Sequence, residues 1–119
     1  MSKKLLICED DRDMCSLLSI FLNSQDCDYQ IVSSGKEVLP LLKREPFNLL
    51  LLDLGLPDMY GTEVAYLVKN DPDTRNTPII YFSANTRLNE AIEEVPVEGI
   101  LSKPFELDEL KKIIDEFLA

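Results

Sequence analysis

Three short apolar runs in this chain each end at a charged residue, and this arrangement constrains the fold more than any other feature of the sequence. The runs are Leu5 to Cys8, Leu49 to Leu52 and Ile100 to Ser102, and they are followed by Glu9 with Asp10, by Asp53 and by Lys103. Short apolar runs separated by helical patterns are typical of buried parallel strands. The carboxyl ends of such strands meet at one edge of an α/β sheet, where ligands bind. We therefore expect these carboxylates and the ammonium group to converge at that edge.

Strand and helix patterns alternate along the whole chain. Strands are predicted at Lys4 to Cys8, Tyr29 to Val32, Asn48 to Leu52, Pro78 to Phe82 and Gly99 to Ser102. Apolar residues at helical spacing predict a first helix carrying Met14, Leu17, Leu18, Phe21 and Leu22, and a last helix carrying Leu107, Leu110, Ile114, Phe117 and Leu118. The intervening helices are expected after Ser33, Ser34 and Gly35, from about Thr62 to Asn70, and near Thr86 to Glu94. Pro40 predicts a kink or a late start in the helix that follows Gly35. The alternation favours right-handed crossovers and an α/β fold with helices on both faces of a parallel sheet.

Composition limits the class of protein. With 119 residues we expect one domain, and 22 acidic against 12 basic residues give a net charge of −10, which argues against direct nucleic acid binding. No apolar stretch approaches the roughly 20 residues that span a bilayer, and no signal-like segment begins the chain, so we expect a soluble cytoplasmic protein with no membrane partner. The absence of histidine excludes imidazole metal ligands and Ser-His-Asp triads. Cys8, Cys15 and Cys27 are expected to be reduced, incidental thiols.

The chemistry is expected to come from the charged and hydroxyl side chains at the strand ends. Glu9, Asp10 and Asp53 form a set of hard oxygen ligands suited to Mg²⁺, for which Mn²⁺ can substitute. Two such charges about 5 Å apart repel by roughly 3 kcal/mol at an effective dielectric near 20, so a cation is expected among them. Asp53 is the candidate nucleophile for a phosphoryl group, because carboxylates can carry acyl phosphates. Ser83 and Lys103 are suited to contact the phosphoryl oxygens.

Each of these residues taken alone also has a plain structural interpretation. Glu9 and Asp10 could begin a helix, a role that we assign to Asp11 and Asp13, because acidic side chains favour the helix dipole there. Asp53 could end a strand in a turn, Ser83 could cap a turn, and Lys103 could simply be solvated. Pro57, Asp58 and Gly61 are interpreted as turn residues only. The joint arrangement favours a functional site.

These residues resemble the receiver domain of two-component response regulators, over nearly the whole chain. The resemblance is carried by the acid pair in LLICEDD, the aspartate in LLLLDLGLPDMYG, the hydroxyl in IIYFSAN, and the lysine and proline in ILSKPF. It implies a flavodoxin-like, doubly wound five-stranded sheet in the order 2-1-3-4-5, with a cis peptide bond before Pro104. It also implies that residues 1–119 form one receiver domain, with no output domain on this chain.

The resemblance further implies a phosphoacceptor signalling module. Asp53 would be phosphorylated by a histidine kinase or a His-containing phosphotransfer protein, changing the binding of an unknown downstream protein. Mg²⁺ would be bound by Asp10, Asp53 and the carbonyl group of Gly55, with Glu9 in the outer shell, while Ser83 and Lys103 would contact the phosphate. Such a domain is not an enzyme in the usual sense, since it catalyses only its own phosphorylation and dephosphorylation.

Two alternatives and two departures from the family pattern remain. An aspartate-nucleophile, Mg²⁺-dependent phosphatase needs a second acid where this chain has Gly55, and a phosphorylation-independent interaction module would not need the complete set of acids and lysine.

Ile100 stands where receivers commonly carry a switching aromatic residue, and we expect it to stay packed, with the response running through Ser83 and residues 83–87. The segment from Ser83 to Lys103 is short and contains Pro96, which predicts a short or irregular fourth helix.

Overall fold

Five parallel strands form the sheet on which the chain is organised, and the computed structural model describes residues 3–25, 27–84 and 88–118. The strands are β1 (Lys4–Cys8), β2 (Asp28–Val32), β3 (Leu49–Leu52), β4 (Ile79–Ser83) and β5 (Gly99–Ser102). Their order is β2-β1-β3-β4-β5, which confirms the predicted α/β topology. The helices are α1 (Arg12–Asn23), the 3₁₀ turn η1 (Gly35–Glu37), α2 (Val38–Arg44), α3 (Gly61–Lys69), α4 (Leu88–Glu94) and α5 (Leu107–Leu118). Across the described ranges, no helix combines the length and apolar character needed to cross a membrane.

The predicted element boundaries are close to the observed ones, and the differences have local causes. β4 begins at Ile79 rather than at Pro78, since proline has no N–H group to donate to a neighbouring strand. The late start expected near Pro40 is confirmed, because the chain first makes η1 and Pro40 then lies in the first turn of α2, where its missing N–H group is not needed. The predicted start of the fourth helix at Thr86 lies outside the described residues, and α4 is described from Leu88.

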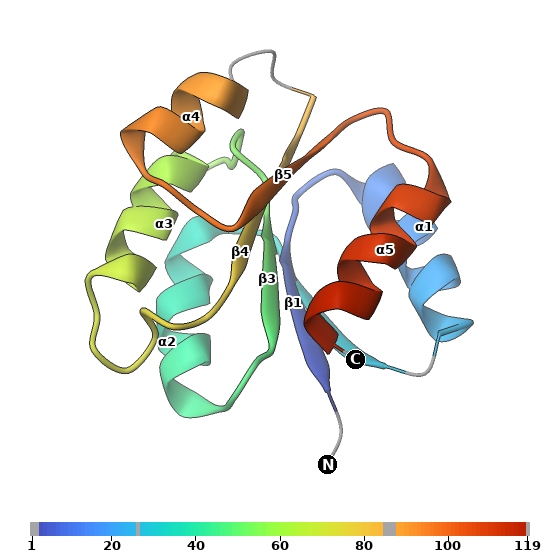
Figure 1. Cartoon of the computed structure of the whole chain (residues 1–119), viewed down its shortest axis with the longest axis horizontal. Helices are drawn as coiled ribbons and strands as arrows, with labels where there is room; N and C mark the ends of the chain where they lie inside the picture. Colours follow the sequence, from blue (N-terminus) through green and yellow to red (C-terminus); the bar gives the residue numbers. More distant parts are fainter. Residues whose placement is uncertain (1–2, 26, 85–87, 119) are drawn as a thin grey trace.

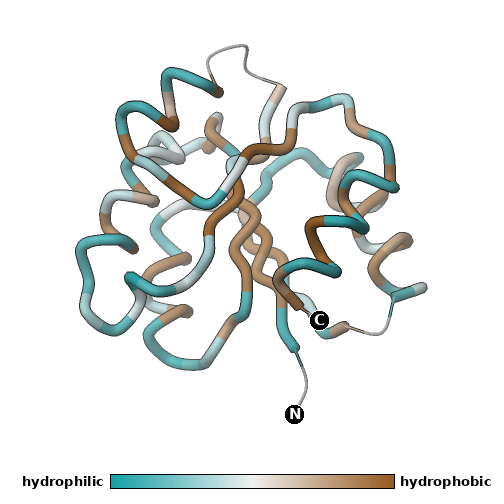
Figure 2. The backbone as a smooth tube through the Cα atoms, in the orientation of Figure 1, coloured by the Kyte–Doolittle hydropathy of each residue, from teal (hydrophilic) through white to brown (hydrophobic). Residues whose placement is uncertain are grey.

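The sheet separates two hydrophobic clusters, which together form the core (Figure 1). Alternate residues of β1 point to opposite faces, so Leu6 and Cys8 pack under α2, α3 and α4, while Leu5 and Ile7 pack under α1 and α5. The central strands are the most apolar part of the chain, as the brown segments of Figure 2 show. Full burial of each such leucine stabilises the fold by roughly 2 kcal/mol.

The apolar stripes of the outer helices are narrower than the sequence predicts. Leu18 and Leu22 of α1 are fully buried, but Leu17 is 42% exposed; in α5, Leu110 is buried and Leu107 is 41% exposed. Leu17 is about 100° from its neighbour Leu18 around the axis of α1, which places it beside the buried stripe, whereas Leu107 is the first residue of α5. Leu17 and Leu107 therefore belong to the surface rather than to the core.

Candidate functional site

The three predicted acids lie together at the carboxyl ends of β1 and β3. Backbone hydrogen bonds between neighbouring chain segments extend one residue beyond the strands at this edge. The Asp53 N–H group donates to the Cys8 carbonyl oxygen at 3.1 Å, and the Glu9 N–H group donates to the Val32 carbonyl oxygen at 3.0 Å. One carboxylate oxygen each from Glu9, Asp10 and Asp53 lies within 4.8 Å of the others. Glu9 and Asp53 are buried, with 1% and 6% exposure, whereas Asp10 is exposed. The predicted convergence of carboxylates is confirmed.

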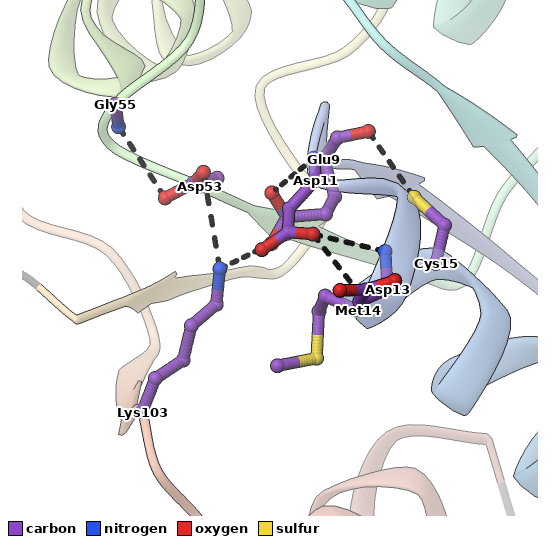
Figure 3. Close-up of polar contacts among 8 residues, drawn as sticks. All are labelled: Glu9, Asp11, Asp13, Met14, Cys15, Asp53, Gly55 and Lys103. Carbon is purple, nitrogen blue, oxygen red and sulfur yellow. Dashed lines mark hydrogen bonds and ion pairs between the residues drawn. The ribbon is translucent and has the colours of Figure 1, made fainter.

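Lys103 reaches this cluster from the end of β5 (Figure 3). Its N–H group donates to the Ser83 carbonyl oxygen at 3.0 Å, and the peptide bond that follows it, to Pro104, is cis as expected. The ammonium group donates to Glu9 Oε1 and lies 3.9 Å from Asp53 Oδ2. It also lies 4.4 Å from the centre of the Phe82 ring. The predicted convergence of the ammonium group with the acids is therefore confirmed as well.

The contact between Lys103 and Glu9 offsets part of the negative charge of the acid cluster. Burial raises the pKa of Glu9, while the hydrogen bonds from Lys103 and from the Asp11 N–H group act in the opposite direction and the Asp53 charge raises it further. The sequence predicted that the Lys103 ammonium group lies among the acids but did not predict which acid it pairs with, and the structure pairs it with Glu9. A single ammonium group does not balance three carboxylates, so the cluster keeps an excess of negative charge.

Gly61 allows the start of α3 to lie against the backbone of Asp53. A methyl group added at Gly61 would lie 2.4 Å from the Asp53 carbonyl oxygen and 2.9 Å from Leu54 Cα. Every other residue type would force this backbone apart, so the interpretation of Gly61 as a turn residue only is wrong. Its one sequence signal is a glycine directly before an apolar helical pattern. Gly55, by contrast, has open space around it, and its N–H group donates to Asp53 Oδ1 at 3.3 Å.

Asp58 connects two loops that are distant in sequence. Its carboxylate accepts the N–H groups of Gly35 at 2.8 Å and Lys36 at 2.9 Å, at the start of η1. These bonds lower the pKa of Asp58 below its usual value, with the Gly35 bond as the largest cause. The interpretation of Asp58 as a turn residue only is therefore also wrong. No local sequence pattern could have indicated it, because the partner Gly35 is 23 positions away.

Ser83 and Ile100 lie on neighbouring strands with different surroundings. Ser83 is the last residue of β4, is 5% exposed and pairs with Ser102 of β5. Ile100 is 37% exposed, so the expectation that it is packed is wrong. β5 is an edge strand, and the described part of the α4 helix beside it has seven residues, which leaves Ile100 partly uncovered. The expected response segment includes residues 85–87, which lie outside the described residues.

The donor set fits a Mg²⁺ ion. Carboxylate oxygens together with water are the ligands that this ion prefers in proteins. Both Glu9 oxygens already accept hydrogen bonds, Oε1 from Lys103 and Oε2 from the Asp11 N–H group at 3.2 Å. These contacts of Glu9 favour the predicted arrangement, in which Asp10 and Asp53 are direct ligands and Glu9 lies in the outer shell, and that arrangement stays a prediction. Burial raises the pKa of the nearby Cys8 thiol to about 12, which makes Cys8 a poor nucleophile or ligand.

Comparisons with known proteins identify a common family. Among curated relatives, the chain is 36% identical over 120 residues to the transcriptional regulatory protein CrdR of Helicobacter pylori, covering 98% of this chain and 55% of CrdR. It is 34% identical over 115 residues to the response regulator protein PilR of Pseudomonas aeruginosa, covering 94% of this chain and 25% of PilR. The chain thus spans about half of the first relative and a quarter of the second.

Solved structures show the same fold. A putative response regulator from Chloroflexus aurantiacus superposes with a TM-score of 0.90 at 26% identity, covering 99% of this chain and 98% of the other. The receiver domain of sensor histidine kinase PA1611 from Pseudomonas aeruginosa, with a magnesium ion in its active-site cleft, superposes with a TM-score of 0.89 at 23% identity, covering 99% and 98%. The family model of the response regulator receiver domain matches residues 5–115. From these matches and its own topology, the chain belongs to the response regulator receiver domain family.

Proposed function

We propose that this receiver domain accepts a phosphoryl group on Asp53 and that the modified domain binds a protein target with altered affinity. The observation that carries the proposal is the placement of the Asp53 carboxylate, which is buried at a strand end, 3.9 Å from the Lys103 ammonium group and beside the carboxylates of Glu9 and Asp10. A carboxylate held next to a fixed cation and a candidate metal site is suited to nucleophilic attack on phosphorus.

The proposed transfer moves one phosphoryl group. An Asp53 carboxylate oxygen attacks the phosphorus atom and forms the acyl phosphate bond, while the bond from phosphorus to the donor breaks. If the donor is a phosphohistidine, the imidazole nitrogen leaves with the bonding electron pair and is reprotonated. Lys103 stays protonated and stabilises charge on the phosphoryl oxygens, and the Ser83 hydroxyl group is proposed to donate to one of them.

Asp10 and Asp53, with the Gly55 carbonyl group, are the proposed Mg²⁺ ligands. When bound, Mg²⁺ would neutralise charge on the phosphoryl oxygens. The role of Glu9 is to hold Lys103, since the two side chains form a buried ion pair. Lys103 thereby lies beside Asp53 before any donor arrives, so little reorganisation is needed at the moment of transfer.

The proposed partners are a histidine kinase or a His-containing phosphotransfer protein as donor and a protein as target. Membership of the receiver family supports the first, because response regulators receive their signal from such donors. This chain contains no histidine, so a phosphohistidine donor has to be another chain.

Labelling by acetyl phosphate tests the proposal without a partner protein. In Mg²⁺ buffer, intact mass spectrometry should show one added phosphoryl group, and chelation of the metal should abolish it. Asp53→Asn should remain unlabelled, whereas Asp58→Asn, with the same charge change in the same loop, should still be labelled. Lys103→Ala should slow labelling by roughly a hundredfold, the typical cost of a lost oxyanion contact. Equal labelling of Asp53→Asn would overturn the proposal.

A further inference from the structure

A groove runs between α3 and α4, and one end of it reaches Leu54, the residue after Asp53. Two adjoining hollows of about 490 and 410 Å³ make up this groove and share Thr62, Glu63 and Glu94 as lining residues. Figure 1 shows α3 and α4 as neighbours on the same face of the sheet. We call this feature the α3–α4 groove, and its character is set by the apolar side chains of Met59, Tyr66 and Leu67 and the carboxylates of Glu63, Glu90 and Glu94.

Large apolar side chains are exposed along the groove. Tyr66 is 58% and Leu67 44% exposed, and Tyr60, which lines the end near the Asp53 loop, is 70% exposed. Exposed aromatic and aliphatic side chains gathered in a hollow rimmed by polar groups are typical of a protein interaction site. Ile20 of α1 is also exposed, but it lines neither of these two hollows.

Two carboxylates of the groove, Glu63 and Glu94, carry the argument about its charge. Within the described residues, no lysine or arginine forms an ion pair with Glu63 or Glu94. Lys69, at the end of α3, forms an ion pair with Glu98, with its Nζ atom 2.9 Å from Glu98 Oε1. Glu94 also ends α4, whose last turn has no basic residue, and a negative charge is unfavourable at that end of a helix dipole. Glu63 and Glu94 therefore present negative charge in the groove that no described lysine or arginine pairs with.

We propose that the α3–α4 groove docks a basic amphipathic segment of a partner protein. Its apolar side chains would pack on Tyr66 and Leu67, and its lysine or arginine side chains would pair with Glu63 and Glu94. A second copy of this chain is a poor occupant, because each copy carries a net charge of −10 and the groove is itself acidic. Docking here goes beyond the proposed phosphoacceptor role, since it needs no modification of Asp53.

A synthetic amphipathic helix of leucine and lysine is the probe for charge. It should bind the wild-type chain in fluorescence anisotropy, and the same peptide with glutamate in place of lysine should not. Glu94→Gln should weaken binding roughly two- to fivefold, the value of one exposed ion pair. Glu93→Gln is the matched control, because Glu93 precedes Glu94 on α4 but does not line the groove. If Glu93→Gln and Glu94→Gln weaken probe binding equally, binding depends only on the net charge of the chain, and the proposal is overturned.

A second pair of variants tests the apolar contact. Leu67→Ala should weaken probe binding, whereas Leu107→Ala on α5 should not, although the two leucines are 44% and 41% exposed. Backbone amide shifts on adding the probe should lie on α3 and α4; shifts centred on α1 or α5 would contradict the proposal. Asp53→Asn should bind the probe normally. Loss of probe binding would therefore count against the docking proposal, and loss of labelling at Asp53 would count only against the phosphoacceptor proposal. If the wild-type chain self-associates and Glu94→Gln abolishes this self-association, a second copy of the chain occupies the groove, and the proposal is overturned.

Discussion

The ammonium group of Lys103 donates to Glu9 and also lies 3.9 Å from the carboxylate of Asp53. A lysine has several N–H donors, so it can keep one contact while making another. Glu9 is nearly inaccessible to solvent and Lys103 is mostly buried. The pair therefore has two roles, because it compensates a charge within the fold and holds a cation beside the candidate phosphoacceptor.

Removal of Lys103 should be costly because it leaves Glu9 as a buried, uncompensated acid. We expect Lys103→Met to lower the free energy of unfolding at neutral pH by about 3 kcal/mol, measured by urea denaturation. Lys111→Met is the matched control on α5, where the ion pair with Asp115 is exposed, and it should cost less than about 0.5 kcal/mol. Adding Glu9→Gln to Lys103→Met should recover part of the loss. Similar costs for Lys103→Met and Lys111→Met would contradict this account of the pair.

Mg²⁺ should stabilise the folded chain, because the acids that could bind it are assembled only there. At about a hundred times its dissociation constant, the ion should add roughly 2.7 kcal/mol and raise the melting temperature by several degrees. Sodium chloride at matched ionic strength is the control, since screening alone also relieves repulsion between acids. Asp10→Asn should reduce the response to Mg²⁺. An equal response to both salts would show that the acids do not form a specific site.

Gly61 and Gly55 form a matched pair for the packing of the Asp53 loop. We expect Gly61→Ala to lower the free energy of unfolding by about 2 kcal/mol, since its methyl group would lie 2.4 Å from the Asp53 carbonyl oxygen. Gly55→Ala meets nothing within 4 Å and has no positive φ, so it should change stability by less than about 1 kcal/mol. Chemical denaturation measures both, and equal costs would contradict the close approach.

The link made by Asp58 should depend on pH. Hydrogen bonds from Gly35 and Lys36 lower the pKa of Asp58 in the folded chain, so the ionised carboxylate stabilises the fold above the unfolded-state pKa of about 4. This contribution is lost as the pH falls through the lower folded-state pKa. The stability difference between wild type and Asp58→Asn should therefore be largest near neutral pH and shrink progressively below about pH 4. A difference that stays constant down to pH 3 would contradict the assignment.

The sequence predicted the parts of this structure that depend on local pattern. The buried run before Asp53 ends where a parallel strand should, and Asp11 caps α1 by accepting the N–H groups of Asp13 at 2.9 Å and Met14 at 3.4 Å, as expected. Strand order and the cis peptide bond before Pro104 followed from the family resemblance. Convergence of the acids followed from the rule that parallel strands share a carboxyl edge.

What the sequence did not predict depends on contacts between distant segments. Asp58 accepts a hydrogen bond from Gly35, which is 23 positions away. Glycine is needed at position 61 because the Asp53 backbone lies close to it, and the local sequence pattern does not predict that approach. The exposure of Ile100 depends on how far a short α4 covers an edge strand. The pairing of Lys103 with Glu9 spans 94 positions, and the choice between Glu9 and Asp53 as its closer partner is set by side-chain reach within the site.

Locating the phosphoryl group within the chain tests the central claim most directly. After labelling with acetyl phosphate and Mg²⁺, borohydride reduction converts an aspartyl phosphate to homoserine, and peptide mass spectrometry then identifies the modified residue. We predict modification of Asp53 alone among the acids of the site, with Glu9 and Asp10 unmodified. Modification of another residue with Asp53 intact would contradict the account.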